Sequence, residues 1–206
     1  MKTVKMILVG ILCVLFVACD KNNDDADDGA GDGGSGNNKL KTGQVEIKVE
    51  PNNSKKVKFR ATAKKITIDW GDGTTDELTP NGTDRVFIHE YTDQNLKTIL
   101  INTESLTNIG FGDYSAGGTY RELWVGDCSE LEEIHCATEK LTVLEIKDCK
   151  ALRSLNCYNN QLTATALNAL FNSLPATTYG SISISGNPGA GSCDRSIATN
   201  KGWTFY

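Results

Sequence analysis

The strongest constraint on this chain is an internal repeat of 21 residues in its second half. Two segments, beginning at Leu123 and Leu144, match in residue type at eight positions with one constant offset. The matched pairs are Leu123/Leu144, Val125/Ile146, Asp127/Asp148, Cys128/Cys149, Leu131/Leu152, Ile134/Leu155, Cys136/Cys157 and Leu141/Leu162. An ordinary α/β domain does not produce such matches by accident, whereas a fixed period in the low twenties is typical of solenoids. We therefore expect a solenoid in this part of the chain.

Each repeat also contains the pattern apolar-x-x-apolar-x-apolar twice. The copies are Leu96/Ile99/Ile101, Leu106/Ile109/Phe111, Tyr120/Leu123/Val125, Leu131/Ile134/Cys136, Leu141/Leu144/Ile146 and Leu152/Leu155/Cys157. The central apolar-x-apolar pair predicts a short strand whose two apolar side chains point inward. Two such strands per repeat predict a flattened coil with one strand on each side. The segment from Gly112 to Thr119 breaks the register, and we expect it to form a protruding loop.

The last copy extends to Leu152-x-x-Leu155-x-Cys157-x-x-Asn160-x-Leu162, which fits the leucine-rich-repeat consensus with Cys157 in one leucine place. An asparagine at such a corner can satisfy backbone groups that no strand pairs. Residues 96–206 resemble the leucine-rich-repeat proteins found among surface lipoproteins of Gram-negative anaerobes. The resemblance implies a mainly β fold with short helices and places the repeats in residues 96–162.

The end of the chain predicts an α/β cap over residues 163–206. Thr163 is suited to cap a helix, and Pro175 would end it. Between them, Leu167, Leu170, Phe171 and Leu174 are spaced to form one apolar helix face. An alternating segment from Ser181, a short helix over 193–200 and a strand over 203–206 follow. A solenoid needs such an atypical end to cover its terminal repeat.

Residues 40–95 alternate in the period of β-strands and carry a second resemblance. Trp70-Gly-Asp-Gly-Thr74, followed by His89-x-Tyr91, resembles the signature of PKD-type β-sandwich domains. The segment is shorter than a full domain of that family, and Asn95 stands where the family usually has glycine. We therefore expect a β-rich N-terminal cap whose last strand, 96–101, is also the first strand of the solenoid.

The aspartates near that motif do not predict a metal site. Asp69, Asp72 and Asp76 are not spaced as in an EF-type calcium loop. Glycine and Asp72 are turn-forming residues, which accounts for the Gly-Asp-Gly sequence. We expect His89 to be a packed structural residue rather than a catalytic base.

The first 18 residues predict a signal peptide. Lys2 and Lys5 precede a 13-residue apolar stretch that ends at Ala18, directly before Cys19. This arrangement resembles the lipobox of bacterial lipoproteins and implies cleavage before Cys19 and lipid attachment to its sulfur. A plain secretory signal with an incidental cysteine is the alternative.

Residues 19–39 follow as an Asp-, Asn- and Gly-rich segment without a large apolar residue, so we expect a disordered tether. Its acidic run resembles the surface-export signal of some lipoproteins, although a merely solvating linker has the same composition. The expected location is the outer membrane, on the cell surface, with the membrane contacted through the lipid anchor.

Several chemistries have no support in the sequence. The net charge of −5 argues against a nucleic-acid partner. The two histidines, His89 and His135, lie in different segments, and no nucleophile motif or phosphate-binding glycine loop accompanies them. We therefore expect no enzyme activity, no catalytic residue, no metal and no cofactor. Cys128, Cys136, Cys149 and Cys157 are expected to point inward as small hydrophobes, with a disulfide as the alternative.

The function prediction depends on side chains that point outward from the repeat strands. One predicted face carries Glu133, His135, Asn156 and Tyr158, and the other carries Glu122, Trp124, Glu145 and Lys147. A large aromatic residue at an outward position suits recognition of a partner, unless the Gly112–Thr119 loop folds over Trp124. We predict a non-enzymatic protein- or glycan-binding module. The alternatives are a structural envelope component without a soluble ligand and an accessory to a polysaccharide hydrolase.

Overall fold

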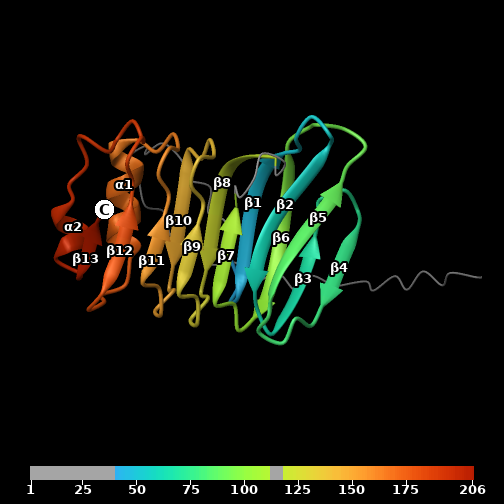
Figure 1. Ribbon diagram of the computed structural model, residues 1–206, viewed down its shortest axis with the longest axis horizontal. Helices are drawn as coiled ribbons and strands as arrows, with labels where there is room; N and C mark the ends of the chain where they lie inside the picture. Colours follow the sequence, from blue (N-terminus) through green and yellow to red (C-terminus); the bar gives the residue numbers. More distant parts are fainter. Residues whose placement is uncertain (1–39, 112–117) are drawn as a thin grey trace, which may run out of the picture. The chain divides into compact units, whose positions relative to one another are not determined.

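The computed structural model describes residues 40–111 and 118–206, which form two mixed β-sheets and two helices. One continuous hydrophobic core lies between the sheets. The strands within residues 108–156 stand between the N-terminal strands and the helical C-terminal end (Figure 1). The prediction of a mainly β chain with short helices is confirmed. The predicted signal peptide, Cys19, the tether and residues 112–117 of the predicted loop lie outside the described residues.

Sheet A has six strands in the order β10-β8-β1-β6-β3-β4. Their bounds are β1 (Gln44–Glu50), β3 (Lys65–Asp69), β4 (Thr75–Leu78), β6 (Lys97–Glu104), β8 (Thr119–Gly126) and β10 (Val143–Lys147). Strand β1 pairs antiparallel with both β6 and β8, so the N-terminal segment and the repeats share one sheet. Thr119 begins β8, so the predicted loop, placed over Gly112–Thr119, ends before that residue.

Sheet B has seven strands in the order β13-β12-β11-β9-β7-β2-β5. Their bounds are β2 (Lys56–Thr62), β5 (Asp84–Glu90), β7 (Asn108–Phe111), β9 (Glu133–His135), β11 (Ser154–Asn156), β12 (Gly180–Ser183) and β13 (Trp203–Phe205). Strand β2 pairs antiparallel with β7, and β7, β9, β11, β12 and β13 then pair in parallel. The N-terminal segment is therefore part of both sheets.

The parallel pairs connect residues that the sequence alignment matched. Leu123 on β8 lies opposite Leu144 on β10, and Ile134 on β9 lies opposite Leu155 on β11. Both pairs span 21 residues. Side chains of these strands alternate between the core and the outer surface, because successive residues of a strand point to opposite faces.

The apolar positions of the predicted pattern are buried with one exception. Leu96 is 53% exposed and precedes β6, which pairs antiparallel with β1 and β3. Leu96, the first apolar position of its copy of the pattern, is therefore not part of the core. Ile99 and Ile101, which follow it on β6, are fully buried as expected. Strand β6 pairs antiparallel with the N-terminal strands β1 and β3, whereas the later strands of the pattern pair in parallel with one another.

The C-terminal segment forms the elements that its sequence predicts. Helix α1 (Ala164–Ser173) begins after Thr163, whose side chain accepts a hydrogen bond from the backbone N–H of Ala166. The predicted apolar face of α1 is buried. The short helix α2 (Ser196–Thr199) precedes β13, in which Trp203 is buried. These elements cover the last parallel strands at one end of the core.

Two buried asparagines connect successive turns of the chain on the C-terminal side of β11 and β12. Asn160 accepts a hydrogen bond from the N–H of Leu141 at 3.0 Å and donates to the carbonyl groups of Cys136 and Cys157 at 2.7 and 3.0 Å. Asn187 repeats this arrangement, accepting from Leu162 and donating to Cys157 and Ile184. The expectation that Asn160 satisfies unpaired backbone groups at a corner is confirmed.

Glu139 occupies the equivalent position 21 residues before Asn160. One of its carboxylate oxygens accepts a hydrogen bond from the N–H of Tyr120 at 3.3 Å. A carboxylate accepts hydrogen bonds but cannot donate one to a carbonyl group unless it is protonated. Burial raises the pKa of Glu139 to about 7, although the hydrogen bond from Tyr120 opposes this effect. Glu139, Asn160 and Asn187 are called the corner ladder below.

Four cysteines of the repeats point into the core, as predicted. Cys128, Cys136, Cys149 and Cys157 are each less than 5% exposed, and all four are free thiols. Burial raises the pKa of Cys136 and raises that of Cys157 to about 12, so both thiols are neutral near pH 7. These side chains therefore pack as small hydrophobic groups.

Candidate binding site

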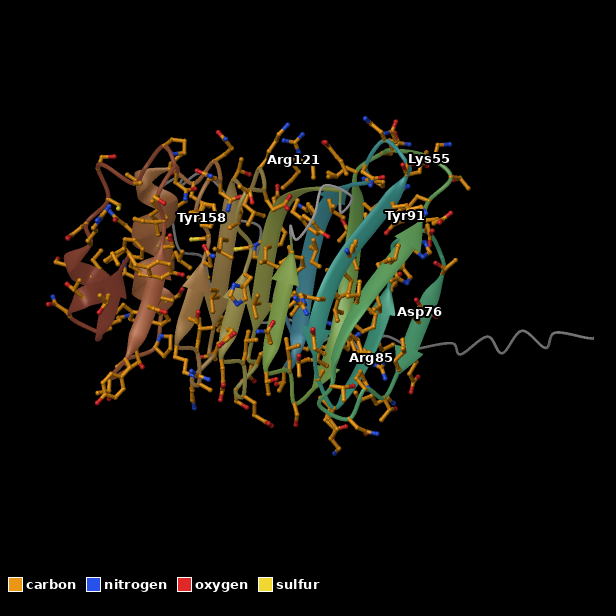
Figure 2. The ribbon with its side chains drawn as sticks, in the orientation of Figure 1. Lys55, Asp76, Arg85, Tyr91, Arg121 and Tyr158 are labelled. Atoms are coloured by element: carbon orange, nitrogen blue, oxygen red, sulfur yellow. The ribbon has the colours of Figure 1, made fainter. Side chains whose placement is uncertain are left out.

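The outer face of sheet B contains a hollow of about 500 Å³. Four of the residues predicted to face outward line it: Glu133, His135, Asn156 and Tyr158. Strand alternation explains why they share one surface, because their neighbours Ile134 and Leu155 are fully buried. His135 lies directly opposite Asn156 across β9 and β11, and Glu133 lies opposite Ser154. Tyr158 follows β11, near the end of the repeat strands (Figure 2).

Gly110 opens this hollow on the side of the N-terminal segment. It lies between Arg60 on β2 and His135 on β9, in one row across three strands. A Cβ atom at Gly110 would lie 3.0 Å from Cγ of Arg60 and 3.8 Å from Cβ of His135. Because glycine has no side chain, the aliphatic part of Arg60 can lie close to β7. The aliphatic part of Arg60 therefore packs over Gly110, with the imidazole of His135 on the other side of the glycine.

Polar contacts hold several of the lining side chains in place. Arg60 forms an ion pair with Asp84 on the neighbouring strand β5. On the other side of the hollow, Nδ2 of Asn108 donates a hydrogen bond of 3.0 Å to Oε2 of Glu133. His135 Nε2 lies 3.4 Å from the same carboxylate oxygen. The hollow therefore has two groups held by polar contacts, the Arg60–Asp84 ion pair and the Asn108–Glu133–His135 cluster.

Asn156 contributes an acceptor that the protein itself does not use. Its Oδ1 atom is buried and has no hydrogen-bond partner within residues 40–111 and 118–206. Nearly all buried polar atoms in native proteins have a partner, so an exception within a polar hollow indicates a place for a bound molecule or water. The side chain next to it along the strand direction, Tyr158, also lines the hollow and is partly exposed.

The second predicted face lies on the outside of sheet A and is arranged differently. Trp124 is partly buried, and Nζ of Lys48 lies 4.9 Å from the centre of its ring. Lys48 also forms an ion pair of 2.7 Å with Glu122. Glu145 lies opposite Trp124 on β10, and Lys147 lines a separate hollow near the end of that strand. The structure thus separates the predicted binding residues into two faces, and Trp124 already has a cationic partner within the chain.

Sequence reasoning missed the part of the hollow that comes from outside the repeats. Arg60 and Asp84 belong to the N-terminal segment, and they approach His135 only because β2 pairs antiparallel with β7. No local periodicity predicts that pairing. The available signal was Gly110, since a glycine within a strand often marks a place where another group approaches closely.

The Trp70–Thr74 turn and the His89-x-Tyr91 segment form a packed structural unit at the other end of the core. The His89 ring stacks on Trp70 at 4.6 Å and meets the Tyr91 ring edge-on at the same distance. His89 Nε2 lies 2.8 Å from Oδ2 of Asp72, and the hydroxyl of Tyr91 donates to the carbonyl of Trp70. Tyr91 is labelled in Figure 2. Partial burial alone would raise the pKa of Asp72, but hydrogen bonds from Thr74 and His89 outweigh it and lower that pKa to about 2. The prediction that His89 is a packed structural residue is confirmed.

Comparison of the chain with protein-family profiles, with characterised proteins and with solved structures gave no match. Within the described ranges, no three His, Cys, Asp or Glu side chains gather closely enough to hold a metal ion. Neither α1 nor α2, the helices of the part that the structure describes, has the length and apolar composition to cross a membrane. The hollow on sheet B is therefore assigned from its own geometry.

Proposed function

We propose that this chain is a lipid-anchored protein of the outer-membrane surface that binds a protein or glycan ligand without catalysing a reaction. The observation that carries the proposal is the hollow on sheet B, which gathers Glu133, His135, Asn156 and Tyr158 and leaves an acceptor of Asn156 without a partner. Glu133, His135 and Asn156 stand on the paired strands β9 and β11, which hold them rigidly and reduce the entropy lost on binding, and Tyr158 follows β11.

The leucine-rich-repeat assignment is part of the same proposal. Parallel pairing over 21 residues and the hydrogen bonds of Asn160 support it. We infer a short solenoid over residues 96–162, with residues 40–95 as the N-terminal cap and residues 163–206 as the C-terminal cap. Repeat proteins of this kind present stacked strands as a wide binding surface, and their specificity resides in the outward side chains.

Binding is favoured over catalysis by the way the polar groups are engaged. Glu133 accepts a hydrogen bond from Asn108, and Arg60 is paired with Asp84. His135 is exposed on the surface, and His89 is packed against Trp70 away from the hollow. A catalytic pair needs a nucleophile or a proton donor aligned with its base. In the described residues His135 lies beside the carboxylate of Glu133, and His89 lies beside Asp72 and Thr74 away from the hollow.

The binding face can be tested with one variant on each sheet. Tyr158→Ala should abolish capture of the ligand from host mucus or from envelope material, because it removes an aromatic side chain of the hollow. Trp124→Ala is the matched control, since it removes an aromatic side chain from the outer face of sheet A. Capture is measured by pull-down with quantitative mass spectrometry. The variants are compared only if their melting temperatures equal that of the wild type. Retention by Tyr158→Ala together with loss by Trp124→Ala would place the ligand on sheet A instead.

The lipid anchor gives a separate prediction. Cys19→Ser should move the protein from the detergent phase to the aqueous phase and abolish its labelling with a fatty-acid analogue, because the sulfur that carries the lipid is gone. Cys193→Ser is a suitable control, as this partly buried cysteine lies in the C-terminal segment, and it should leave the labelling unchanged. A wild-type protein that is unlabelled and remains in the aqueous phase would contradict the anchor.

A further inference from the structure

We propose that the hollow on sheet B binds an uncharged saccharide, with Asn156 and Glu133 as hydrogen-bonding residues and Tyr158 as the stacking residue. This inference rests on the proposed binding function and names the chemistry of the ligand.

The buried amide of Asn156 defines the first requirement. Its Oδ1 atom has no hydrogen-bond partner in the described ranges of the chain, although it is shielded from solvent. An unsatisfied buried acceptor is costly, so a rotation of the Asn156 side chain that brings Oδ1 to a ligand O–H or N–H group in the hollow is favourable. The ligand must therefore bring at least one donor to the row that contains His135 and Asn156.

The remaining polar groups show that the ligand must also accept hydrogen bonds. Donors at the hollow include the guanidinium of Arg60 and the hydroxyl of Tyr158, and acceptors include the carboxylates of Asp84 and Glu133. A hydroxyl group both donates and accepts, whereas an ammonium group only donates. A surface that mixes donors and acceptors in this way is matched by the hydroxyl groups of a sugar better than by a lysine side chain.

Charge excludes the anionic classes of ligand. Arg60 is paired with Asp84, so these two residues add no net charge, while Glu133 leaves the lining negative when His135 is neutral. A phosphate, sulfate or uronate would approach Glu133 without an unpaired cation to balance it, and such a contact is unfavourable. An uncharged saccharide has no such penalty.

The form of the hollow suits a flat, polar molecule. Its volume of about 500 Å³ lies within the range of small-ligand sites, and it is open along the outer surface of the sheet. Gly110 lets the aliphatic part of Arg60 lie flat against the sheet, and the ring of Tyr158 offers an apolar surface against which the C–H groups of a sugar can stack. The hydrogen bond from Asn108 and the ion pair with Asp84 hold Glu133 and Arg60 in place before binding.

The test uses the detergent-solubilised full chain on an array of neutral, sulfated and uronic-acid oligosaccharides, with a lysine-rich peptide on the same surface. Binding to neutral oligosaccharides alone is expected. Asn156→Leu, which is close in shape but lacks the amide, should weaken that binding by about tenfold or more without lowering the melting temperature. Tyr179→Ala, which removes an exposed aromatic side chain that does not line the hollow, should bind as the wild type does.

A second measurement does not depend on any variant folding. The chain has two histidines, and His135 is exposed at the hollow whereas His89 is packed against Trp70. The neutral oligosaccharide with the strongest array signal should slow modification of His135 by diethyl pyrocarbonate and leave the modification rate of His89 unchanged. Unchanged modification of His135 would overturn the assignment of the site.

The outcomes separate this inference from the binding function on which it rests. Preference for anionic oligosaccharides or for the lysine-rich peptide would overturn the saccharide class. Absence of any oligosaccharide binding, with capture from mucus or envelope material still sensitive to Tyr158→Ala, would also overturn it and leave the binding function intact. Absence of both kinds of binding would remove the proposed function itself.

Discussion

Replacement of Asn160 by alanine is expected to lower the free energy of unfolding by about 3–5 kcal/mol, which is a large part of the stability of a domain of this size. Asn160 is fully buried and binds three backbone groups from two turns of the chain. Alanine would leave the N–H of Leu141 and the carbonyl groups of Cys136 and Cys157 without this partner. Each such group costs about 1–3 kcal/mol when it is left unsatisfied away from water. Urea denaturation, followed by circular dichroism, measures the change.

The neighbouring residue provides the control for this prediction. Gln161 is exposed, so Gln161→Ala should change the stability by no more than about 0.5 kcal/mol. Asn160→Asp keeps the acceptor but loses the donor, and it should be destabilised as well. If Asn160→Ala costs less than about 1 kcal/mol, the hydrogen bonds of the corner ladder contribute little to stability.

Glu139 is the position of the corner ladder at which a substitution should stabilise the protein. Its pKa is raised from 4.5 to about 7 in the folded chain, so the folded state holds the proton more tightly than the unfolded state. The associated stability is complete below about pH 4.5 and is lost as the pH rises through 7. Glu139→Gln keeps the shape and removes the charge, so it should stabilise the protein at pH 8 by about 1 kcal/mol and have little effect at pH 4. Equal effects at both pH values would contradict this explanation.

The repeat strands were the most predictable part of the fold because the spacing of their apolar residues is a local pattern and recurs after 21 residues. Ile134 and Leu155 occupy equivalent places in the alignment, and the structure pairs them directly. The corner asparagine was equally clear at Asn160, whereas Asn187 was missed because α1 lengthens the interval between the two residues to 27. Asn187 makes the same kind of hydrogen bonds as Asn160, although it does not follow the 21-residue period.

The junction between the N-terminal segment and the repeats was less predictable, since antiparallel pairing between distant strands leaves no periodic signature. The exposed Leu96 shows this, because an apolar-x-x-apolar-x-apolar pattern occurs at β6 in a strand that pairs antiparallel. The same limitation applies to the candidate site. His135 and Asn156 could be placed on one face from alternation alone, but Arg60 reaches them only through the pairing of β2 with β7.

The second large effect is expected at the leucines that the repeat strands direct into the core. Leu144 and Leu155 belong to different sheets and are 3% and 0% exposed in the same core. Either residue replaced by alanine should lower the free energy of unfolding by about 2–5 kcal/mol, because a cavity remains where the side chain was packed. The size of each loss depends on how far the neighbouring side chains can move into the cavity, which the close packing of a protein core limits.

Outward residues next to these leucines are the matched controls. Glu145→Ala and Ser154→Ala change the adjacent positions on β10 and β11, which face away from the core, and each should cost no more than about 0.5 kcal/mol. Chemical denaturation of all four variants gives the comparison directly. The register of both strands would be wrong if the two leucine variants lost less than about 0.5 kcal/mol, since a shift by one residue exchanges the inward and outward sets. If only one leucine variant loses stability, the register is wrong only in the strand of the other leucine. The two strands can be judged separately because Leu144 and Leu155 are held by the separate pairings β8–β10 and β9–β11.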